Sequence, residues 1–454
     1  MIVMKFGGTS VGSAERIRGV SDLVAQRLDR QPVVVVSALS KITDLLIKGA
    51  RLSLERDPAA EAVPAEILAR HVEVIDALLP AGLVRDRLVH HVEAIVQELR
   101  TLYTGVHYLG ELTPRSLDAI SGMGERLSSE IVAAAMKERG LPARAIDSRE
   151  VMVTDDSFSR AQPLMQETST RVAELVKPVV TDGQVPVLGG FIGRTKSGIS
   201  TTLGRGGSDW TAAIYGALLS AEEIQIWTDV DGMMTLDPRV FPAAKVIREI
   251  SFDEAAELSY FGAKVLHPAT IRPAVERDIP VRILNSMNPL APGTLITARS
   301  GAPAGEPRAI AFKRGITVLL ISQPKMLMAH GFVSRVFDVF QKHRTAVDLI
   351  ATSEVSISLT VDDSATLPAI ETDLAALGDV RVLGAMAIVS VVGRGFLTHH
   401  GLASRVFKSV GNVNVVMISF GASDVNLSLV VAEADAEKAV RKLHEEFFGA
   451  GPAA

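Results

Sequence analysis

The sequence predicts an α/β fold in which a mostly parallel sheet is flanked by helices and followed by two smaller α+β units. Residues 2–6 and 32–38 are short apolar runs rich in β-branched residues, and each runs into Gly, Ser or Thr. Between them, residues 14–30 carry apolar side chains at helical spacing, so strand, helix and strand form a parallel unit. Residues 185–193 and 223–232 again have the pattern of buried strands that end in polar loops. In open α/β sheets, ligands bind at such carboxyl ends of strands.

The final third of the chain contains an internal repeat. The segment GFVSRVF at 331–337 returns as GLASRVF at 401–407, and TSEVSISLTV at 352–361 matches ASDVNLSLVV at 422–431 at the same offset. Chance similarity between two helices is the alternative, but it does not explain why the strand segments agree at that offset too. We therefore expect two copies of a strand–helix–strand unit of about 70 residues.

A segment dense in Gly, Pro and Ala separates this repeat from the larger N-terminal part and is expected to be a linker. Whether strands interleave between the two repeat units is left open. The predicted division is residues 1–297 for the N-terminal domain, 298–308 for the linker, 309–384 for the first repeat unit and 385–454 for the second.

The composition excludes several classes of function. A chain of 454 residues with 47% hydrophobic and 22% charged residues is ordinary for a globular protein of several domains. A net charge of −5 provides no basic field, so we expect no nucleic-acid partner. The absence of cysteine excludes disulfides, cysteine-ligated zinc and thiol catalysis, and it suits the cytoplasm, where we expect the protein. We see no signal-peptide core and no apolar run of about 18 residues, so we expect no membrane partner.

The first motif that carries chemistry is KFGGTSVG at 5–12, directly after the first predicted strand. Gly7 and Gly8 allow the backbone to approach a phosphate, adjacent N–H groups form an anion-binding nest, and Lys5 adds a positive charge. This is not a Walker A loop, because the lysine precedes the glycines. A tight turn between a strand and a helix explains the motif equally well.

The second motif is TTLGRGGSDWTAA at 201–213, which predicts a loop that caps a helix. Ser208 or Asp209 is suited to the cap. Arg205 stands between glycines that offer little surface for its stem, so its guanidinium is suited to bidentate capture of a carboxylate or a phosphate. A solvated loop arginine is the alternative.

Two further motifs follow, WTDVDGMMTLDPRV at 227–240 and FGAKVLHPAT at 261–270. The aspartates of the first, Asp231 and Asp237, suit either turns or Mg²⁺ ligation, and turns are the more common use. In the second, Lys264 lies beside a glycine in an apolar run. A lone lysine is usually a surface residue, but this setting favours a function.

Together with GERLSS at 124–129, these motifs stand in the order and spacing of the aspartate kinase branch of the amino acid kinase family, which the chain resembles over essentially its whole length. The repeat resembles that family's paired ACT domains. The resemblance implies the amino acid kinase fold followed by two ACT units of βαββαβ type. It also implies ATP-dependent phosphorylation of the side-chain carboxylate of aspartate, the first step towards lysine, threonine and methionine.

The resemblance also implies the residues of the nucleotide side, with Lys5, Asp209 and Lys264 as the catalytic set. Where relatives often carry a tyrosine near the adenine, this chain has Met234. Mg²⁺ is expected to bind mainly through ATP, without a metal site of the protein's own. The residues matched to ATP binding are Lys5, Phe6, Gly7, Gly8, Thr228, Asp229, Met234, Arg239, Lys264 and Val265.

On the substrate side, the resemblance implies that Arg205 clamps the α-carboxylate of aspartate and that Glu125 receives its α-ammonium group. The nucleophile is a carboxylate that is already ionised at neutral pH, so no general base is required. The residues matched to aspartate binding are Ser37, Thr43, Glu125, Arg205, Gly206, Gly207 and Ser208.

The first repeat unit is expected to bind an amino-acid effector. Asp348 and Glu354 are two acids near one expected pocket, which favours a cationic side chain, and the second copy has Ile418 in place of Asp348. This resembles the lysine-sensitive type, although Met328, Ala329 and Ala346 stand where lysine-sensitive relatives carry polar residues. Solvated strand-end charges are the alternative for both acids. The effector residues are Met326, Gly331, Phe332, Val333, Asp348, Ser353 and Glu354.

The expected partners are aspartate, ATP and L-lysine, with a homodimer or tetramer formed through the ACT units. Two other functions are alternatives to this one. A kinase of the same fold could act on glutamate or acetylglutamate. A non-catalytic amino-acid sensor should have lost Lys5, Arg205, Asp209 or Lys264, and all four are present.

Overall fold

The computed structural model describes residues 1–262, 266–299, 301, 303–323, 331–362 and 365–449. Its contacts group the chain into two compact units. Unit 1 comprises Met1–Gly232 and Leu266–Ala298, and unit 2 comprises Met233–Val265 and Arg299–Ala454. The domain boundaries expected from the sequence remain a prediction.

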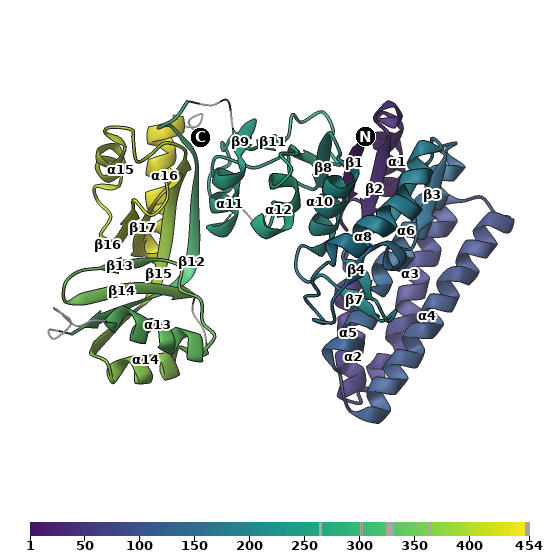
Figure 1. Cartoon of the computed structure of the whole chain (residues 1–454), viewed down its shortest axis with the longest axis horizontal. Helices are drawn as coiled ribbons and strands as arrows, with labels where there is room; N and C mark the ends of the chain where they lie inside the picture. Colours follow the sequence, from purple (N-terminus) through teal and green to yellow (C-terminus); the bar gives the residue numbers. More distant parts are fainter. Residues whose placement is uncertain (263–265, 300, 302, 324–330, 363–364, 450–454) are drawn as a thin grey trace. The chain divides into compact units, whose positions relative to one another are not determined.

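Unit 1 contains a large sheet and a small one, with helices around them (Figure 1). Its strands are β1 (Ile2–Phe6), β2 (Pro32–Val36), β3 (Ala143–Ile146), β4 (Val153–Thr154), β5 (Val185–Gly189), β6 (Ile192–Thr195), β7 (Ser200–Thr202), β8 (Glu223–Thr228), β10 (Val281–Asn285) and β11 (Thr294–Thr297). Its helical segments are α1 (Ala14–Ala25), η1 (Leu28–Arg30), α2 (Ile42–Leu54), η2 (Pro58–Ala62), α3 (Val63–Leu78), α4 (Leu83–Leu109), α5 (Pro114–Ser121), α6 (Met123–Glu138), α7 (Ser148–Val151), α8 (Met165–Arg171), η3 (Val172–Val176), α9 (Lys177–Thr181), α10 (Gly207–Leu219), η4 (Pro268–Ile271) and α12 (Arg272–Val275).

Within unit 1 the large sheet has the order β3-β5-β2-β1-β8-β10-β11. Its neighbours are parallel from β3 to β10, and β11 is antiparallel to β10. Every residue of β1, β2 and β5 is buried, which is why these strands are continuous apolar runs instead of alternating ones. The strands expected within residues 2–6, 32–38, 185–193 and 223–232 are confirmed as β1, β2, β5 and β8. The small sheet has the order β4-β6-β7.

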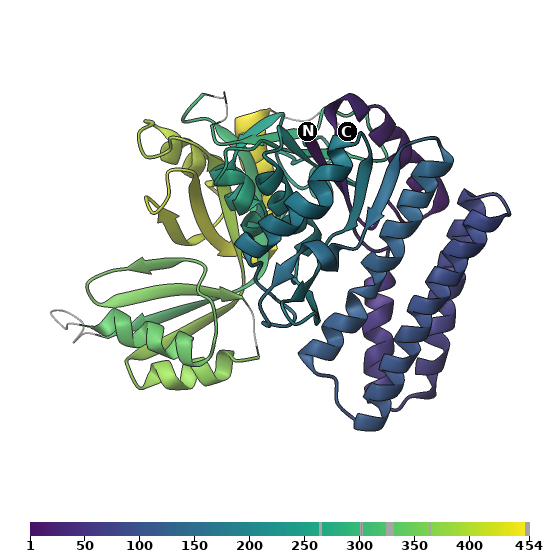
Figure 2. The same ribbon diagram turned by 45° about the vertical axis from the view of Figure 1, so that its right-hand side comes forward.

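Helices cover both faces of the large sheet. On one face, α1 and α6 share a hydrophobic core with Met4 and Phe6 of β1. Successive residues of a strand point to opposite faces, so Lys5 points to the other face, where α10 contacts β1, β2 and β8. Helix α1 starts where expected because Ser13 caps it, accepting a hydrogen bond from the Arg16 N–H. The long helices α3 and α4 pack side by side (Figures 1 and 2).

Unit 2 is built on an antiparallel sheet with the order β13-β14-β12-β15-β17-β16. Its elements are β9 (Glu249–Ser251), α11 (Phe252–Tyr260), β12 (Pro307–Ser322), α13 (Phe332–Lys342), β13 (Ile350–Thr352), β14 (Ser356–Asp362), α14 (Leu367–Ala375), β15 (Asp379–Gly393), α15 (Leu402–Val410), β16 (Val415–Phe420), β17 (Asn426–Ala432) and α16 (Glu433–Phe448).

The internal repeat is confirmed, and its two copies interleave. Helices α13 and α15 both begin after a glycine in the left-handed conformation, Gly331 and Gly401. The long strands β12 and β15 pair along their whole length, while β14 pairs only with the second half of β12 and β17 only with the second half of β15. The first half of β12 therefore pairs with the second half of β15, beside the strands of the second copy. The second half of β12 lies beside the strands of the first copy.

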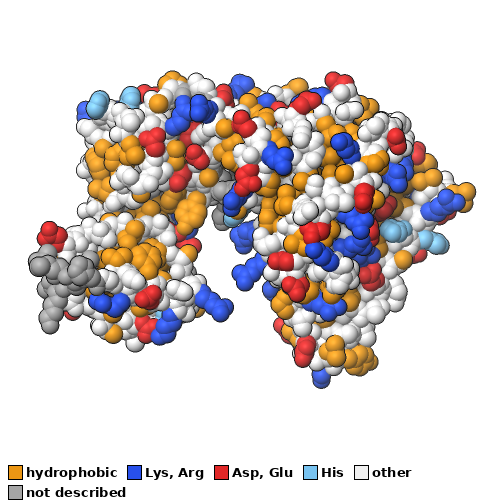
Figure 3. Space-filling model, in the orientation of Figure 1, with side chains coloured by type: hydrophobic (Ala, Val, Ile, Leu, Met, Phe, Trp, Pro, Cys, Tyr) orange, Lys and Arg blue, Asp and Glu red, His pale blue; other side chains and the backbone are white. Residues whose placement is uncertain are grey.

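Among the described helices, none has both the length and the apolar character needed to cross a membrane. On the molecular face drawn in Figure 3, acidic and basic side chains are interspersed.

Candidate active site

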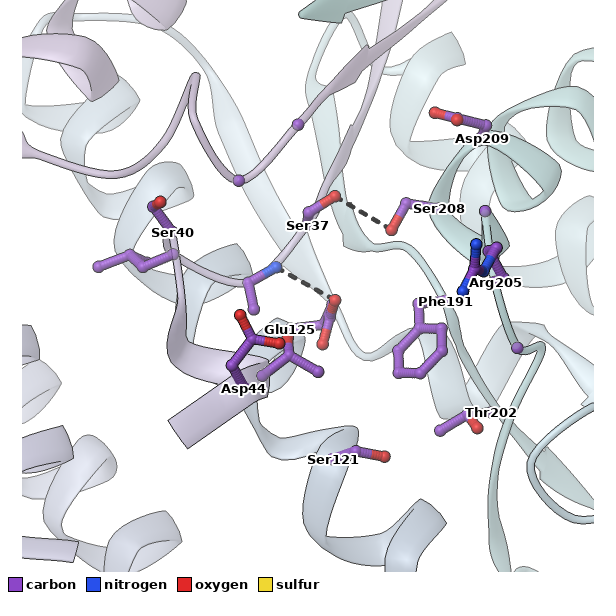
Figure 4. Close-up of a pocket in the computed structure, with 18 of the residues that line it drawn as sticks. Ser37, Ser40, Asp44, Ser121, Glu125, Phe191, Thr202, Arg205, Ser208 and Asp209 are labelled. Carbon is purple, nitrogen blue, oxygen red and sulfur yellow. Dashed lines mark hydrogen bonds between the residues drawn. The ribbon is translucent and has the colours of Figure 1, made fainter. Parts of the chain in front are cut away.

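A cavity of about 720 Å³ lies at the carboxyl ends of β1, β2 and β8 in unit 1 (Figure 4). The loops that follow β1 and β2, the end of β8, the first turn of α10 and parts of α2, α5 and α6 line it. The structure brings together most of the residues expected from the sequence. Those that line the cavity are Lys5, Gly7, Gly8, Ser37, Thr43, Glu125, Arg205, Gly206, Gly207, Ser208, Asp209, Thr228 and Asp229.

Lys5 forms the positive centre of the β1 side of this cavity. Its Nζ lies 2.6 Å from Oδ1 of Asp209, and both side chains are largely buried. Asp209 lies in the first turn of α10, where the helix dipole favours a negative charge. The pair places an ammonium group beside Gly7, at the carboxyl end of β1.

The glycines of the first loop are needed for close packing. A Cβ atom at Gly8 would lie 2.9 Å from the carbonyl oxygen of Ala38, so the loops after β1 and β2 touch through their backbones. The Gly7 N–H donates to the carbonyl of Trp227, which ties this loop to β8. A tight turn, the alternative to a phosphate-binding loop, therefore explains Gly8. The same loop also lies on the cavity wall beside Lys5, as a phosphate-binding loop would.

Glu125 lies at the start of α6 and is almost fully buried, with 3% of its surface exposed. Its Oε1 accepts a hydrogen bond from the Ala38 N–H at 3.1 Å, and its Oε2 has no hydrogen-bond partner among the described residues. Burial raises the pKa of Glu125 from its ordinary value of 4.5 to about 8, against the opposing effects of the Ala38 N–H and of Lys5. A buried carboxyl group with one unpaired oxygen in a cavity suits a cationic ligand group.

Arg205 lies in the loop between β7 and α10, and its side chain is exposed on the cavity. The residues on either side, Gly204 and Gly206, have φ of +80° and +73°, which explains the two glycines. Three residues after Arg205, Ser208 accepts a hydrogen bond from the Ser37 hydroxyl at 3.1 Å (Figure 4). This contact joins the end of β2 to the start of α10. The expectation that Ser208 or Asp209 caps α10 is wrong, because the capping position is Gly206.

On the remaining nucleotide side, Thr228 donates a hydrogen bond to Asp229 at the end of β8. The side chain of Phe6 does not line the cavity but stacks on Trp227 in the core. Met234 and Arg239 belong to unit 2, where Arg239 pairs with Asp237 in an exposed turn. Asp237 therefore makes a turn, as the more common use of such residues suggested. Lys264 and Val265 lie outside the described residues.

The cavity also contains residues to which the sequence assigned no role, although Thr202 lies within the motif at 201–213. Asp44 on α2, Phe191 after β5 and Thr202 at the end of β7 line it (Figure 4), together with Asp118 on α5. Asp118 and Glu125 lie on consecutive but separate helices, α5 and α6, so no helical spacing in the sequence links them. Phe191 has a positive φ of +66°, which the sequence does not reveal.

In unit 2, the expected effector residues differ in burial: the Asp348 side chain is buried, whereas Ser353 and Glu354 are exposed. The Asp348 carboxylate is buried and already paired, because Lys313 Nζ lies 3.4 Å away and the Tyr260 hydroxyl donates to it. Ser353 and Glu354 are exposed near the turn between β13 and β14, where Ser353 bonds to Ser356. The alternative that Asp348 is a solvated strand-end charge is therefore wrong, because its side chain is buried, and effector binding stays a prediction.

The other effector residues lie around the start of α13. Gly331 caps this helix, Phe332 is buried beneath it, and Val333 is exposed. Met326 lies outside the described residues, as do Met328 and Ala329.

The chain is similar to known proteins over its whole length. Residues 1–285 match the model of the amino acid kinase family, and residues 389–447 match an ACT domain. The chain is 40% identical to aspartokinase 1, chloroplastic, of Arabidopsis thaliana, over 99% of this chain and 80% of the relative. It is 37% identical to lysine-sensitive aspartokinase 3 of Escherichia coli, over 99% of both chains. The crystal structure of E. coli aspartokinase III in complex with aspartate and ADP superposes with a TM-score of 0.84 over 99% of this chain and 100% of that one, at 37% identity. With a catalytic-domain match, an ACT match and this full-length similarity, the chain belongs to the amino acid kinase family and, within it, to the aspartokinases.

Proposed function

We propose that the protein transfers the γ-phosphoryl group of ATP to the side-chain carboxylate of L-aspartate. An aspartate oxygen forms a bond to the γ-phosphorus while the bond between that phosphorus and the bridging oxygen of ATP breaks. The products are 4-phospho-L-aspartate and ADP. The observation that carries this proposal is one cavity that contains a lysine–aspartate pair, a buried glutamate with an unpaired oxygen, and an exposed arginine.

These groups suit a substrate that carries two carboxylates and one ammonium group. We assign Arg205 to the α-carboxylate, which its planar fork can bind through two hydrogen bonds, and Glu125 to the α-ammonium. Ser37, Thr43 and Ser208 complete the aspartate side together with the backbone at Gly206 and Gly207. Holding the side-chain carboxylate in line with the phosphoryl group is then the main task of the site.

On the nucleotide side, we assign Lys5 to the transferred phosphoryl group, whose negative charge it stabilises as the transition state forms. Asp209 keeps the Lys5 ammonium in place. Gly7, Gly8, Thr228 and Asp229 bind the nucleotide, and the assignments of Phe6, Met234, Arg239, Lys264 and Val265 rest on their motifs alone.

ATP is expected to arrive with Mg²⁺. Carboxylate oxygens are suitable ligands for this ion, and Asp229 is an exposed carboxylate on the cavity wall. When bound, Mg²⁺ neutralises charge on the phosphates. The protein's own part is to bind and align the two anionic substrates.

The proposal extends to regulation and assembly. L-lysine binds at the first ACT copy, near Asp348, and lowers activity by favouring a less active state. The chain assembles as a homodimer or tetramer through its ACT units and works in the cytoplasm, on the route to lysine, threonine and methionine. The relative described as lysine-sensitive supports this choice of effector.

The experiment that tests the proposal is a panel of acceptors in an assay coupled to ADP release. L-aspartate, L-glutamate and N-acetyl-L-glutamate are supplied separately with ATP and Mg²⁺. ADP release that depends on aspartate supports the assignment. Release that depends on glutamate or acetylglutamate alone would move the protein to another kinase activity, and no release with any acceptor would favour a sensor.

A further inference from the structure

Asp118 is a buried carboxylate on the wall of the cavity that none of the substrate assignments uses. It lies on α5, and only 1% of the residue is exposed. Its Oδ2 accepts hydrogen bonds from the Ser159 N–H at 2.8 Å and the Thr202 N–H at 2.9 Å, and its Oδ1 accepts one from the Thr202 hydroxyl at 2.7 Å. One carboxylate thus joins α5, the loop after β4 and the end of β7.

Both hydrogen-bond partners of Asp118, Thr202 and Ser159, lie next to the loop that carries Arg205. Thr202 is the last residue of β7, just before that loop. Ser159 lies against the loop as well, because a Cβ atom at Gly204 would be 2.9 Å from the Ser159 carbonyl oxygen. The two segments are also joined directly, since the Ala161 N–H donates to the Thr202 carbonyl.

The backbone conformation of Ser159 gives the Asp118 carboxylate a second structural role. Ser159 has a φ of +70°, a left-handed conformation that is strained for a residue other than glycine. Its N–H is held by Asp118, which stabilises the strained backbone at the point where it touches Gly204. Strain of this kind, held by a buried charge beside a cavity, is common at functional sites.

Asp118 is not placed to bind the substrate directly. Its oxygens are already engaged by three donors, and its negative charge would repel the carboxylates of aspartate. Arg205, by contrast, makes no hydrogen bond or ion pair through its side chain with any residue that the structure describes, so the position of its guanidinium depends on the backbone beneath it.

We propose that Asp118 is a positioning residue for aspartate: it fixes Thr202 and Ser159, and thereby sets the place of the Arg205 loop that receives the α-carboxylate. This inference rests on the proposed function. It predicts a specific loss of affinity for aspartate, because a displaced guanidinium weakens binding to one substrate and leaves the nucleotide side intact.

The test compares KM values of Asp118 variants. Asp118→Ala should raise the KM for aspartate about tenfold or more and change the KM for ATP by less than about twofold. Asp118→Asn should stay within about threefold of wild type, because its carbonyl oxygen can accept both N–H groups and its amide can donate to Thr202. If Asp118→Ala does not fold, Thr202→Val, which removes only the hydroxyl donor, gives the same test with a smaller rise in the KM for aspartate.

Thr168→Val is the matched control. Thr168 on α8 is fully buried, and its hydroxyl makes two hydrogen bonds with the backbone of Val153 in β4, a strand of the same small sheet. It should lower stability without a selective rise in the KM for aspartate. A similar rise in this control would show that loss of stability alone explains the Asp118 result.

A double-mutant cycle decides whether Asp118 acts through Arg205. Arg205→Lys alone should raise the KM for aspartate. Combined with Asp118→Ala, the rise should be smaller than the product of the two single rises, because both act on one interaction. A rise equal to that product, or a parallel rise in the KM for ATP, would overturn the inference. A wild-type enzyme that does not use aspartate would overturn the proposed function itself, whereas normal aspartate kinetics in Asp118→Ala would overturn this inference alone.

Discussion

The ammonium group of Lys5 lies 2.6 Å from the carboxylate of Asp209, and this pair joins β1 to the first turn of α10. Lys5 is 9% exposed. A buried lysine needs an anionic partner, and Asp209 supplies it without closing the cavity. In the proposed reaction, Asp209 therefore holds the Lys5 ammonium beside the phosphoryl group that is transferred.

Replacing Lys5 with alanine should lower kcat on the order of 10²-fold or more, because the lost charge matters most in the transition state. The measurement is steady-state turnover of a variant whose circular dichroism matches wild type. Lys137→Ala, at an exposed lysine near the end of α6, is the control and should leave kcat unchanged. A folded Lys5→Ala enzyme with wild-type kcat would show that Lys5 does not serve the transferred group.

The raised pKa of Glu125 predicts a pH-dependent affinity for aspartate. Burial raises this pKa to about 8, so at neutral pH the carboxyl group of the free protein is mostly protonated. Binding the α-ammonium requires the carboxylate, so the KM for aspartate should fall as the pH rises from 6 to about 8, approaching tenfold per pH unit at the lower end. Glu125→Gln should raise this KM and remove its pH dependence. An unchanged pH profile in Glu125→Gln would assign the ammonium to another residue.

The same group predicts how stability varies with pH. The pKa of Glu125 is higher in the folded protein than in the unfolded chain, so the folded state binds the proton more tightly. This contribution to the free energy of unfolding is complete below the unfolded value of about 4.5 and is lost as the pH rises towards about 8. Urea unfolding of wild type and Glu125→Gln across pH 5.5–8.5 measures it. The stability of wild type relative to the variant should fall with rising pH, and a constant difference would contradict the raised pKa.

Asp348 and Lys313 give a test of the proposed effector site. The Lys313 ammonium already lies 3.4 Å from Asp348, where the side chain of the effector lysine is expected, and it also pairs with Asp362 at 2.7 Å. Removing this internal competitor in Lys313→Met should lower the lysine concentration that gives half-inhibition. Asp348→Ala should raise it at least tenfold, since the anion is lost.

Activity would be titrated separately with lysine, threonine and methionine. Lys342→Met, which removes an exposed lysine paired with Asp373 in the same unit, is the control and should keep the wild-type response. Lysine inhibition that persists unchanged in Asp348→Ala, or inhibition by threonine in place of lysine, would refute the assignment.

Much of the fold could be predicted because it is encoded locally. Apolar runs such as 32–38 specify buried parallel strands, and the repeat at 331–337 and 401–407 specifies two similar units. The membership of the chain in the aspartokinases is confirmed, and the resemblance that indicated it rested on short motifs. The roles given to single residues by that resemblance stay predictions.

The remainder depends on contacts between distant parts of the chain. Thr235 bonds to His444 across 209 positions, and Asp348, in the segment before β13, pairs with Lys313 of β12. Asp118 meets Thr202 in the same way, 84 positions away. No local pattern specifies which partner such a polar side chain finds, because register and packing decide it. The sequence therefore marked the cavity-lining glycines and charges but not Asp118, the buried carboxylate that joins Thr202 to Ser159.

The most direct measurement of the central claim is the identity of the phosphorylated product. The purified protein would be incubated with ATP, Mg²⁺ and L-aspartate in the presence of hydroxylamine, which converts an acyl phosphate into a stable hydroxamate whose position mass spectrometry identifies. The account predicts aspartate 4-hydroxamate, formed in proportion to ADP and abolished in the Lys5→Ala and Arg205→Ala double variant. Hydroxamate formed from glutamate but not from aspartate, or ADP release without any hydroxamate, would contradict it.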